Sequence, residues 1–147
     1  MNRFKRYLAV EIGIEFKASL YFWAILFYYC TYRLIIGIYQ ADILIIAEMI
    51  MTTYIMGYVQ VYLLRNFEET DRLGLFEWVA SLGCSVFYGV ESYLLSWFAR
   101  NPWVSLGFAF YMLVCYLCFI AVYYVKRKFD TEMLNQELNV YKRKGEQ

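Results

Sequence analysis

The chain has 147 residues, of which 62% are hydrophobic and 18% are charged, and its net charge is +1. A typical soluble domain is nearer half apolar and a quarter charged, so this composition favours a membrane protein. The chain contains no histidine, which excludes a serine–histidine triad and removes the commonest metal ligand. The sequence also has no glycine-rich phosphate loop, and we predict no enzyme activity, cofactor or metal site.

Four long apolar stretches follow one another along the chain. A helix needs about 20 mostly apolar residues to cross a bilayer, and each stretch meets that length. The predicted spans are residues 18–39, 43–64, 75–98 and 103–125. We therefore predict an all-α integral membrane protein, with residues 1–147 forming a single domain built on a four-transmembrane-helix bundle.

The segment before the first span mixes apolar and charged residues. Apolar side chains recur at helical spacing over residues 8–16, which favours an amphipathic N-terminal helix lying at the membrane interface. The alternative is a first span that starts near Tyr7 and buries Glu11 and Glu15.

The basic residues predict the orientation. Twelve of the 14 lysines and arginines lie before the first span, between the second and third, or after the fourth. Because cytoplasmic segments carry the excess of basic residues, both termini should be cytoplasmic. The predicted location is the cell membrane, with a cytoplasmic loop at 65–74 and a cytoplasmic helical tail at 126–147.

Charged residues inside the spans need partners, because isolated charges are costly in hydrocarbon. Arg33 lies seven residues before Gln40, and Glu48 lies seven after Ala41. In a helical hairpin both side chains reach the same depth, so we predict that Arg33 pairs with Glu48 and that Glu91 lies in the same outer layer. The layer is either a structural clamp or a small polar cavity that binds a proton, a cation or a cationic ligand. A third alternative is that one of these side chains reaches out to the interface.

Small residues recur every four positions in the third span, at Ser81, Ser85 and Gly89. Such spacing lets helix backbones approach closely. The stripe predicts packing within the bundle or, alternatively, a homodimer contact.

The loop and the tail are the candidate surface for a partner. The predicted docking residues are Glu68, Glu69, Asp71 and Arg72 of the loop and Leu134, Leu138 and Tyr141 of the tail. In the tail, the apolar spacing of four and three resembles a short coiled-coil seam. The alternatives are that the loop is polar because any such connection meets water, and that the tail rests on the membrane. Acidic residues interrupt the basic surface, so we predict no nucleic-acid binding.

Three stretches together resemble a known family. They are EIGIEFKASLYFWAILFYYCTYRLIIGIY, AEMIMTTYIMGYVQVYLLRNFEETDRLGLFEW and YYVKRKFDTEMLNQELN. They are similar to short four-span proteins of Gram-positive bacteria, the family of domain of unknown function three-zero-two-one. Some members resemble membrane partners of LytTR-type transcription regulators, which are thought to hold the regulator inactive. Many members carry a histidine in the third span, and because this chain has none, no role for that residue transfers.

These observations predict a non-enzymatic, integral membrane regulatory or accessory protein that sequesters a cytoplasmic transcription regulator. The first alternative is a small proton- or cation-coupled transporter acting as a dimer. The second is an accessory subunit of a larger membrane transporter.

Overall fold

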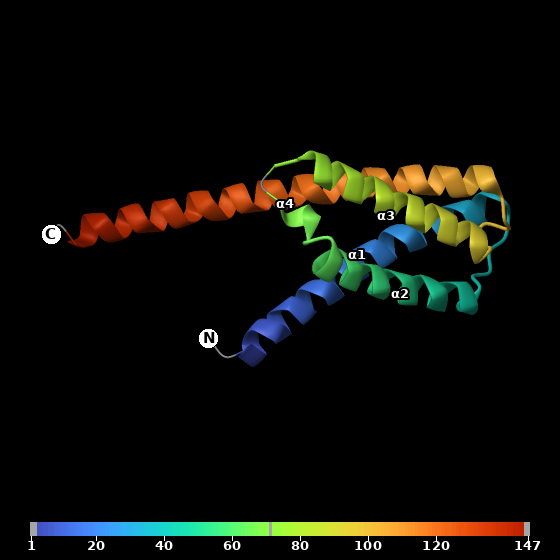
Figure 1. Ribbon diagram of the computed structural model, residues 1–147, viewed down its shortest axis with the longest axis horizontal. Coiled ribbons are helices and arrows are strands. Elements are labelled where there is room, and N and C mark those ends of the chain that lie inside the picture. Colours follow the sequence, from blue (N-terminus) through green and yellow to red (C-terminus); the bar gives the residue numbers. More distant parts are fainter. Residues whose placement is uncertain (1–2, 71, 146–147) are drawn as a thin grey trace.

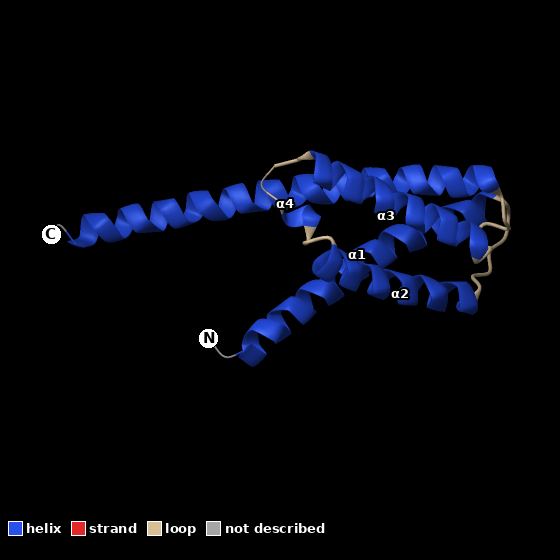
Figure 2. Ribbon diagram, viewed as in Figure 1, coloured by secondary structure: helices blue, strands red, loops and turns tan. Residues whose placement is uncertain are grey.

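The computed structural model describes residues 3–70 and 72–145, and within these ranges the regular structure is entirely helical (Figure 2). The helices are α1 (Arg3–Ile35), α2 (Ile43–Tyr58), α3 (Leu75–Leu94) and α4 (Pro102–Gly145), with a short π-helix η1 (Val59–Leu63) and a 3₁₀-helix η2 (Phe67–Glu69) between α2 and α3. The prediction of an all-α fold is confirmed.

The four α-helices form an elongated bundle (Figure 1). The most extensive contacts join α3 to α4 and α1 to α2. The described parts of α1 and α4 project from the same end of the bundle, where the connection from α2 to α3 also lies. We call this the loop end and the opposite end, which carries the other two connections, the hairpin end.

Local sequence signals set the hairpin between α1 and α2. Gly37 has a φ of +78°, a left-handed conformation that glycine adopts without strain. The amide of Ile38 donates to the carbonyl of Arg33, and that of Gly37 donates to the carbonyl of Leu34. This is the Schellman arrangement that ends a helix. The Asp42 side chain then accepts from the amide of Leu44 and caps α2.

The first helix differs from its prediction. α1 runs without a break from Arg3 to Ile35, so the predicted N-terminal helix and the first apolar stretch form one continuous helix. The helix continues because its N-terminal half packs along α2. A side chain at Gly57 would lie 3.3 Å from the Ile14 side chain, so glycine permits this close contact. The hydroxyl of Tyr58 also donates to Glu11.

The third helix is shorter than the predicted span of 75–98. α3 ends at Leu94, and the chain then turns through left-handed residues at Ser96, Ala99 and Arg100. This turn folds Trp97 and Phe98 back into the core, where both are buried. Phe98 packs against Tyr28 and Phe108 there, so an aromatic cluster closes the hairpin end.

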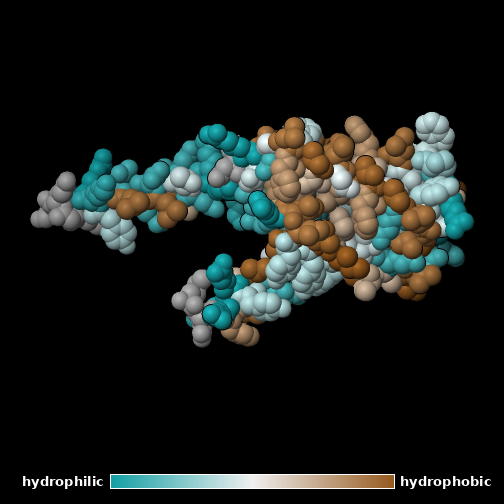
Figure 3. Space-filling model, viewed as in Figure 1, coloured by the Kyte–Doolittle hydropathy of each residue, from teal (hydrophilic) through white to brown (hydrophobic). Residues whose placement is uncertain are grey.

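Large apolar side chains also cover the outside of the bundle (Figure 3). Examples are Trp23 and Phe27 on α1, which are both about two-thirds exposed. Two helical stretches, Ile43–Leu63 and Pro102–Arg143, are long and apolar enough to cross a membrane. The α4 projection is mostly hydrophilic by contrast, with apolar patches along it (Figure 3).

Candidate functional site

A buried ion pair lies at the loop end. The ammonium of Lys17 lies 3.6 Å from a carboxylate oxygen of Glu68 and 3.5 Å from one of Glu69. Lys17 and Glu68 are almost fully buried. Lys17 also donates to the side-chain oxygen of Asn66, and the Tyr21 hydroxyl donates to Glu68. We call these five residues the Lys17 cluster.

The loop backbone positions this cluster. Arg65 and Asn66 have φ values of +53° and +54°, and asparagine tolerates this left-handed conformation better than most residues. The turn feeds η2, which inserts Phe67 into the core 5.8 Å from the Tyr116 ring. Arg127 of α4 donates to the backbone carbonyl of Glu69. The loop is thereby held between α1 and α4.

The environment of Glu68 acts on its protonation in two opposing ways. Burial raises the pKa of this carboxyl above its usual value, and the positive charge of Lys17 partly offsets that increase. The buried charge of Glu68 therefore depends on Lys17.

This geometry changes the predicted docking surface of the loop. The prediction for Glu68 is wrong, because its side chain is 1% exposed and pairs internally with Lys17. Glu69 keeps about half of its side chain exposed, and Arg72 is exposed. Asp71 lies outside the described residues. Only part of the predicted loop surface is therefore open to a partner.

A second set of polar groups lies deeper in the core. The amide nitrogen of Gln60 donates to the Tyr116 hydroxyl at 2.6 Å, and both side chains are fully buried. The π-helical turn η1 carries Gln60, and such turns are frequent at functional sites. Tyr116 lies close enough to Cys84 and Tyr88 on α3 to interact with them electrostatically. Its ring also lies 4.8 Å from that of Tyr21.

The predicted outer layer is present only in part. The prediction that Arg33 pairs with Glu48 is wrong. The guanidinium of Arg33 donates instead to the backbone carbonyl of Gln40, at 3.2 and 2.7 Å, and lies 5.6 Å from the centre of the Tyr29 ring. The reason is local: the turn after α1 brings the Gln40 carbonyl within reach of Arg33 before α2 begins.

The two carboxylates of that layer do come together. Glu48 accepts a hydrogen bond from the Trp97 indole at 3.0 Å, and Glu91 accepts one from the Thr52 hydroxyl at 2.7 Å. The two acids lie close enough to interact electrostatically. The hairpin end therefore holds two half-buried carboxylates whose bonded partners are neutral groups.

The stripe of small residues packs inside the chain. Ser81, Ser85 and Gly89 are buried. A side-chain carbon at Gly89 would lie 2.7 Å from that of Ala109 on α4. The structure therefore supports the intramolecular alternative, and these three residues offer no exposed surface for a homodimer.

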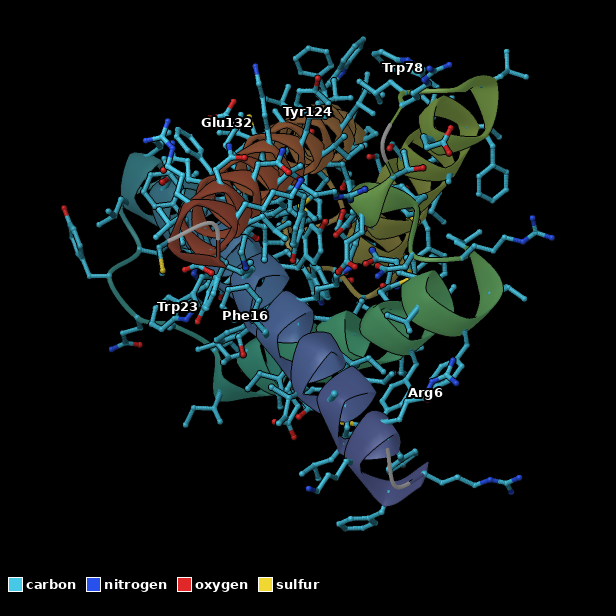
Figure 4. All side chains as sticks on the ribbon, turned by 90° about the vertical axis from the view of Figure 1, so that its left-hand side faces the viewer. Arg6, Phe16, Trp23, Trp78, Tyr124 and Glu132 are labelled. Carbon is cyan, nitrogen blue, oxygen red and sulfur yellow. The ribbon has the colours of Figure 1, made fainter. Side chains whose placement is uncertain are left out.

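The predicted tail residues are exposed. Leu134, Leu138 and Tyr141 lie on the part of α4 that projects beyond the bundle, and each has more than half of its side-chain surface open. Figure 4 views the molecule from the loop end, where Glu132 on this projection and Arg6 on the start of α1 lie on well-separated helices. The tail prediction is consistent with this arrangement, because its apolar residues are accessible.

Several interior residues did not stand out in the sequence. They are Lys17, Tyr21, Gln60, Tyr88 and Tyr116. The spacing of these residues could have indicated that they share helix faces. Lys17 and Tyr21 are one helical turn apart, and Cys84, Tyr88 and Glu91 are spaced by four and three.

No protein-family model, curated protein or solved structure matches this chain.

Proposed function

We propose that this chain is a non-enzymatic membrane protein with four spans and cytoplasmic termini, and that it holds a soluble cytoplasmic regulator on the projecting part of α4. The observation that carries the proposal is the projection itself. Residues 126–143 of α4 continue the helix past the bundle, and all but Arg127 are exposed.

The exposed apolar surface supports a membrane location. Side chains such as Trp23, Phe27 and Leu94 would be unfavourable in water and favourable in lipid. α1 has 33 residues and α3 has 20, so both are long enough to cross a bilayer beside α2 and α4. The buried lysine of α1, Lys17, is turned inward and pairs with Glu68 of η2 at the loop end.

The common end of the projections supports cytoplasmic termini. The described ends of α1 and α4 and the loop all lie at the loop end (Figure 1). That end also carries the predicted excess of lysine and arginine, which favours the cytoplasmic side.

The chemistry of the projection indicates the kind of partner. An isolated helix of this length is marginal in water, so a docked partner would stabilise it. The apolar side chains are Phe129, Met133, Leu134, Leu138, Val140 and Tyr141, and basic residues flank them at both ends. The fitting partner is a protein with an apolar groove and an acidic rim. The resemblance to membrane partners of LytTR-type regulators suggests a transcription regulator of that kind.

The test compares two substitutions that add the same charge on different faces of the tail. We expect a soluble regulator to co-purify from the native cell in mild detergent with the full chain and with the Asn139→Glu variant. It should be lost with Leu138→Glu and with a chain ending at Lys128, while membrane insertion stays intact. Equal recovery with Leu138→Glu, or recovery of no soluble protein with the full chain, would overturn the docking proposal.

A further inference from the structure

The half-buried guanidinium of Arg33 carries a positive charge that no carboxylate of the described residues neutralises. It donates from Nε and Nη2 to the backbone carbonyl of Gln40, at 3.2 and 2.7 Å, and Nη1 has no acceptor within residues 3–70 and 72–145. The two acids nearest in the sequence have other partners, because Asp42 caps α2 and Glu48 accepts from the Trp97 indole. Arg33 therefore lacks a counter-ion from its own chain.

Arg33 also lines a hollow on the surface of the hairpin between α1 and α2. The hollow has a volume of about 250 Å³, and most of its other lining groups are apolar. Among them are Cys30 and Leu34 of α1 and Ile38 and Tyr39 of the turn, and all four side chains are exposed. One cation beside an accessible apolar wall suits a ligand that has an anionic head and an apolar chain.

An exposed apolar row continues the hollow along α1. Trp23, Phe27, Cys30 and Leu34 follow at spacings of four, three and four, which places them on one face of the helix. Each of these side chains is exposed. At the usual helical rise the row is about 16 Å long, close to the depth of about 15 Å that the hydrocarbon of one leaflet occupies.

Aromatic residues indicate that the hollow lies at the level of the lipid head groups. Tyr39 and Trp103 are 84% and 79% exposed at the hairpin end, and such amphipathic rings settle at the membrane interface. We propose that Arg33 and the hollow bind an anionic phospholipid of the leaflet at the hairpin end. The lipid phosphate contacts the guanidinium, and one acyl chain lies along the row. This inference rests on the membrane arrangement proposed above and is independent of the docking partner.

The local structure explains the position of Arg33 but leaves its charge uncompensated. The C-terminal end of α1 favours a positive charge, and the bond to Gln40 closes the turn. Neither supplies a counter-ion, and an unpaired charge at the edge of the hydrocarbon is unfavourable. Phosphate fits this need, because the planar guanidinium matches its geometry and the pair forms strong hydrogen bonds. An anionic lipid fits better than a zwitterionic one, whose phosphate already has a cation of its own.

The test uses the purified full chain in phosphatidylcholine liposomes that contain a trace of a photoactivatable lipid. The probe is phosphatidylglycerol or phosphatidylcholine with the same diazirine-bearing acyl chain, and mass spectrometry identifies the labelled peptides. We expect phosphatidylglycerol to label residues 23–41 several-fold more than phosphatidylcholine does. Arg33→Gln should lower that labelling to the phosphatidylcholine level. Arg100→Gln is the matched control, because Arg100 is an exposed arginine at the same end, and it should keep the original labelling.

A second variant keeps the proposal testable if Arg33→Gln fails to fold. Ile38→Glu adds a negative charge to the hollow and leaves Arg33 in place, so it should also remove the preference for phosphatidylglycerol. Circular dichroism detects a folding defect in either variant and leaves the other to decide. Excess inorganic phosphate should not change the labelling, and competition by phosphate would overturn the lipid in favour of a soluble anion.

The remaining outcomes separate the lipid site from the membrane arrangement. Protease access to the tail reports insertion in the same liposomes. Correct insertion with equal labelling by the two lipids, or with equal losses in Arg33→Gln and Arg100→Gln, would overturn the lipid site alone. Failure to insert would overturn the membrane arrangement and the lipid site together.

Discussion

Removing the charge of Lys17 is expected to destabilise the fold strongly. Lys17→Met keeps an unbranched side chain of similar length but leaves the Glu68 carboxylate buried with the Tyr21 hydroxyl as its main partner. At the observed 3.6 Å, the direct attraction is about 4.6 kcal/mol for an effective dielectric constant of about 20. Breaking a buried pair by removing one partner costs about 3–5 kcal/mol, so we expect a loss of about 3 kcal/mol in the free energy of unfolding.

Replacing the acid of the ion pair should destabilise the fold less than replacing the lysine. Glu68→Gln leaves Lys17 with the Glu69 carboxylate at 3.5 Å and the Asn66 side chain. We expect a loss of about 1–2 kcal/mol, and the double variant should lose at least about 1 kcal/mol less than the sum of the two. Glu69→Gln is the matched control: because Glu69 is half exposed, its loss should stay below about 1 kcal/mol.

The loss in Lys17→Met should also depend on pH. Burial raises the pKa of Glu68 in the folded state, so the stability from this group is present when the carboxyl is protonated and is lost as the pH rises through the folded pKa. Without Lys17 nothing equivalent opposes that increase. The deficit of Lys17→Met should therefore be smaller near about pH 5 than near about pH 8.

Equilibrium unfolding in detergent micelles, followed by circular dichroism, measures these differences. The unmodified chain, the two single variants and the double variant are compared at both pH values. Strict additivity of the two substitutions, or a Lys17→Met deficit that does not change with pH, would refute the buried ion pair.

Three further predictions concern packing and turns, and all are measured by the same unfolding experiment. Gly89→Ala should destabilise by about 1–3 kcal/mol, because the new carbon meets α4 at 2.7 Å; Gly83→Ala, on the same helix with nothing within 4 Å, should stabilise by about 0.5–1 kcal/mol, and equal effects at both sites would contradict the close approach. Gly37→Ala should cost about 1–2 kcal/mol because φ is +78°, and an unchanged stability would argue against this helix end. Trp97→Phe should cost about 1–3 kcal/mol by removing the hydrogen bond to Glu48, and an unchanged stability would contradict that bond.

Local sequence signals account for much of the fold. The apolar stretches locate the four helices, and the helical tail follows from continuous periodicity without a breaker. The hairpin turn predicted near Gln40 lies between α1 and α2, where Gly37 ends one helix and Asp42 begins the next. These features depend on residues close in sequence, so one sequence suffices to predict them.

The site was predictable only in part. Equal distances from the turn at Gln40 and Ala41 predict a shared depth for Arg33 and Glu48, because rise along a helix is regular. Glu91 lies close enough to Glu48 to interact with it, although α3 ends at Leu94 and not at the predicted residue 98. The same argument pairs Arg33 with Glu48 incorrectly, because depth says nothing of the direction in which a side chain leaves its helix. The Arg33 guanidinium donates to the nearby backbone carbonyl of Gln40 instead.

Tertiary structure alone decided which charges meet at the loop end. Lys17 and Glu68 are 51 positions apart, and their contact requires α1 to start early, η2 to fold inward and α4 to hold the loop from outside. Each helix can rotate about its axis without changing its own hydrogen bonds, so periodicity shows which residues share a face but leaves open what that face contacts. Packing of all the helices together selects one rotation, and here it buries an acid that the sequence alone placed on the surface.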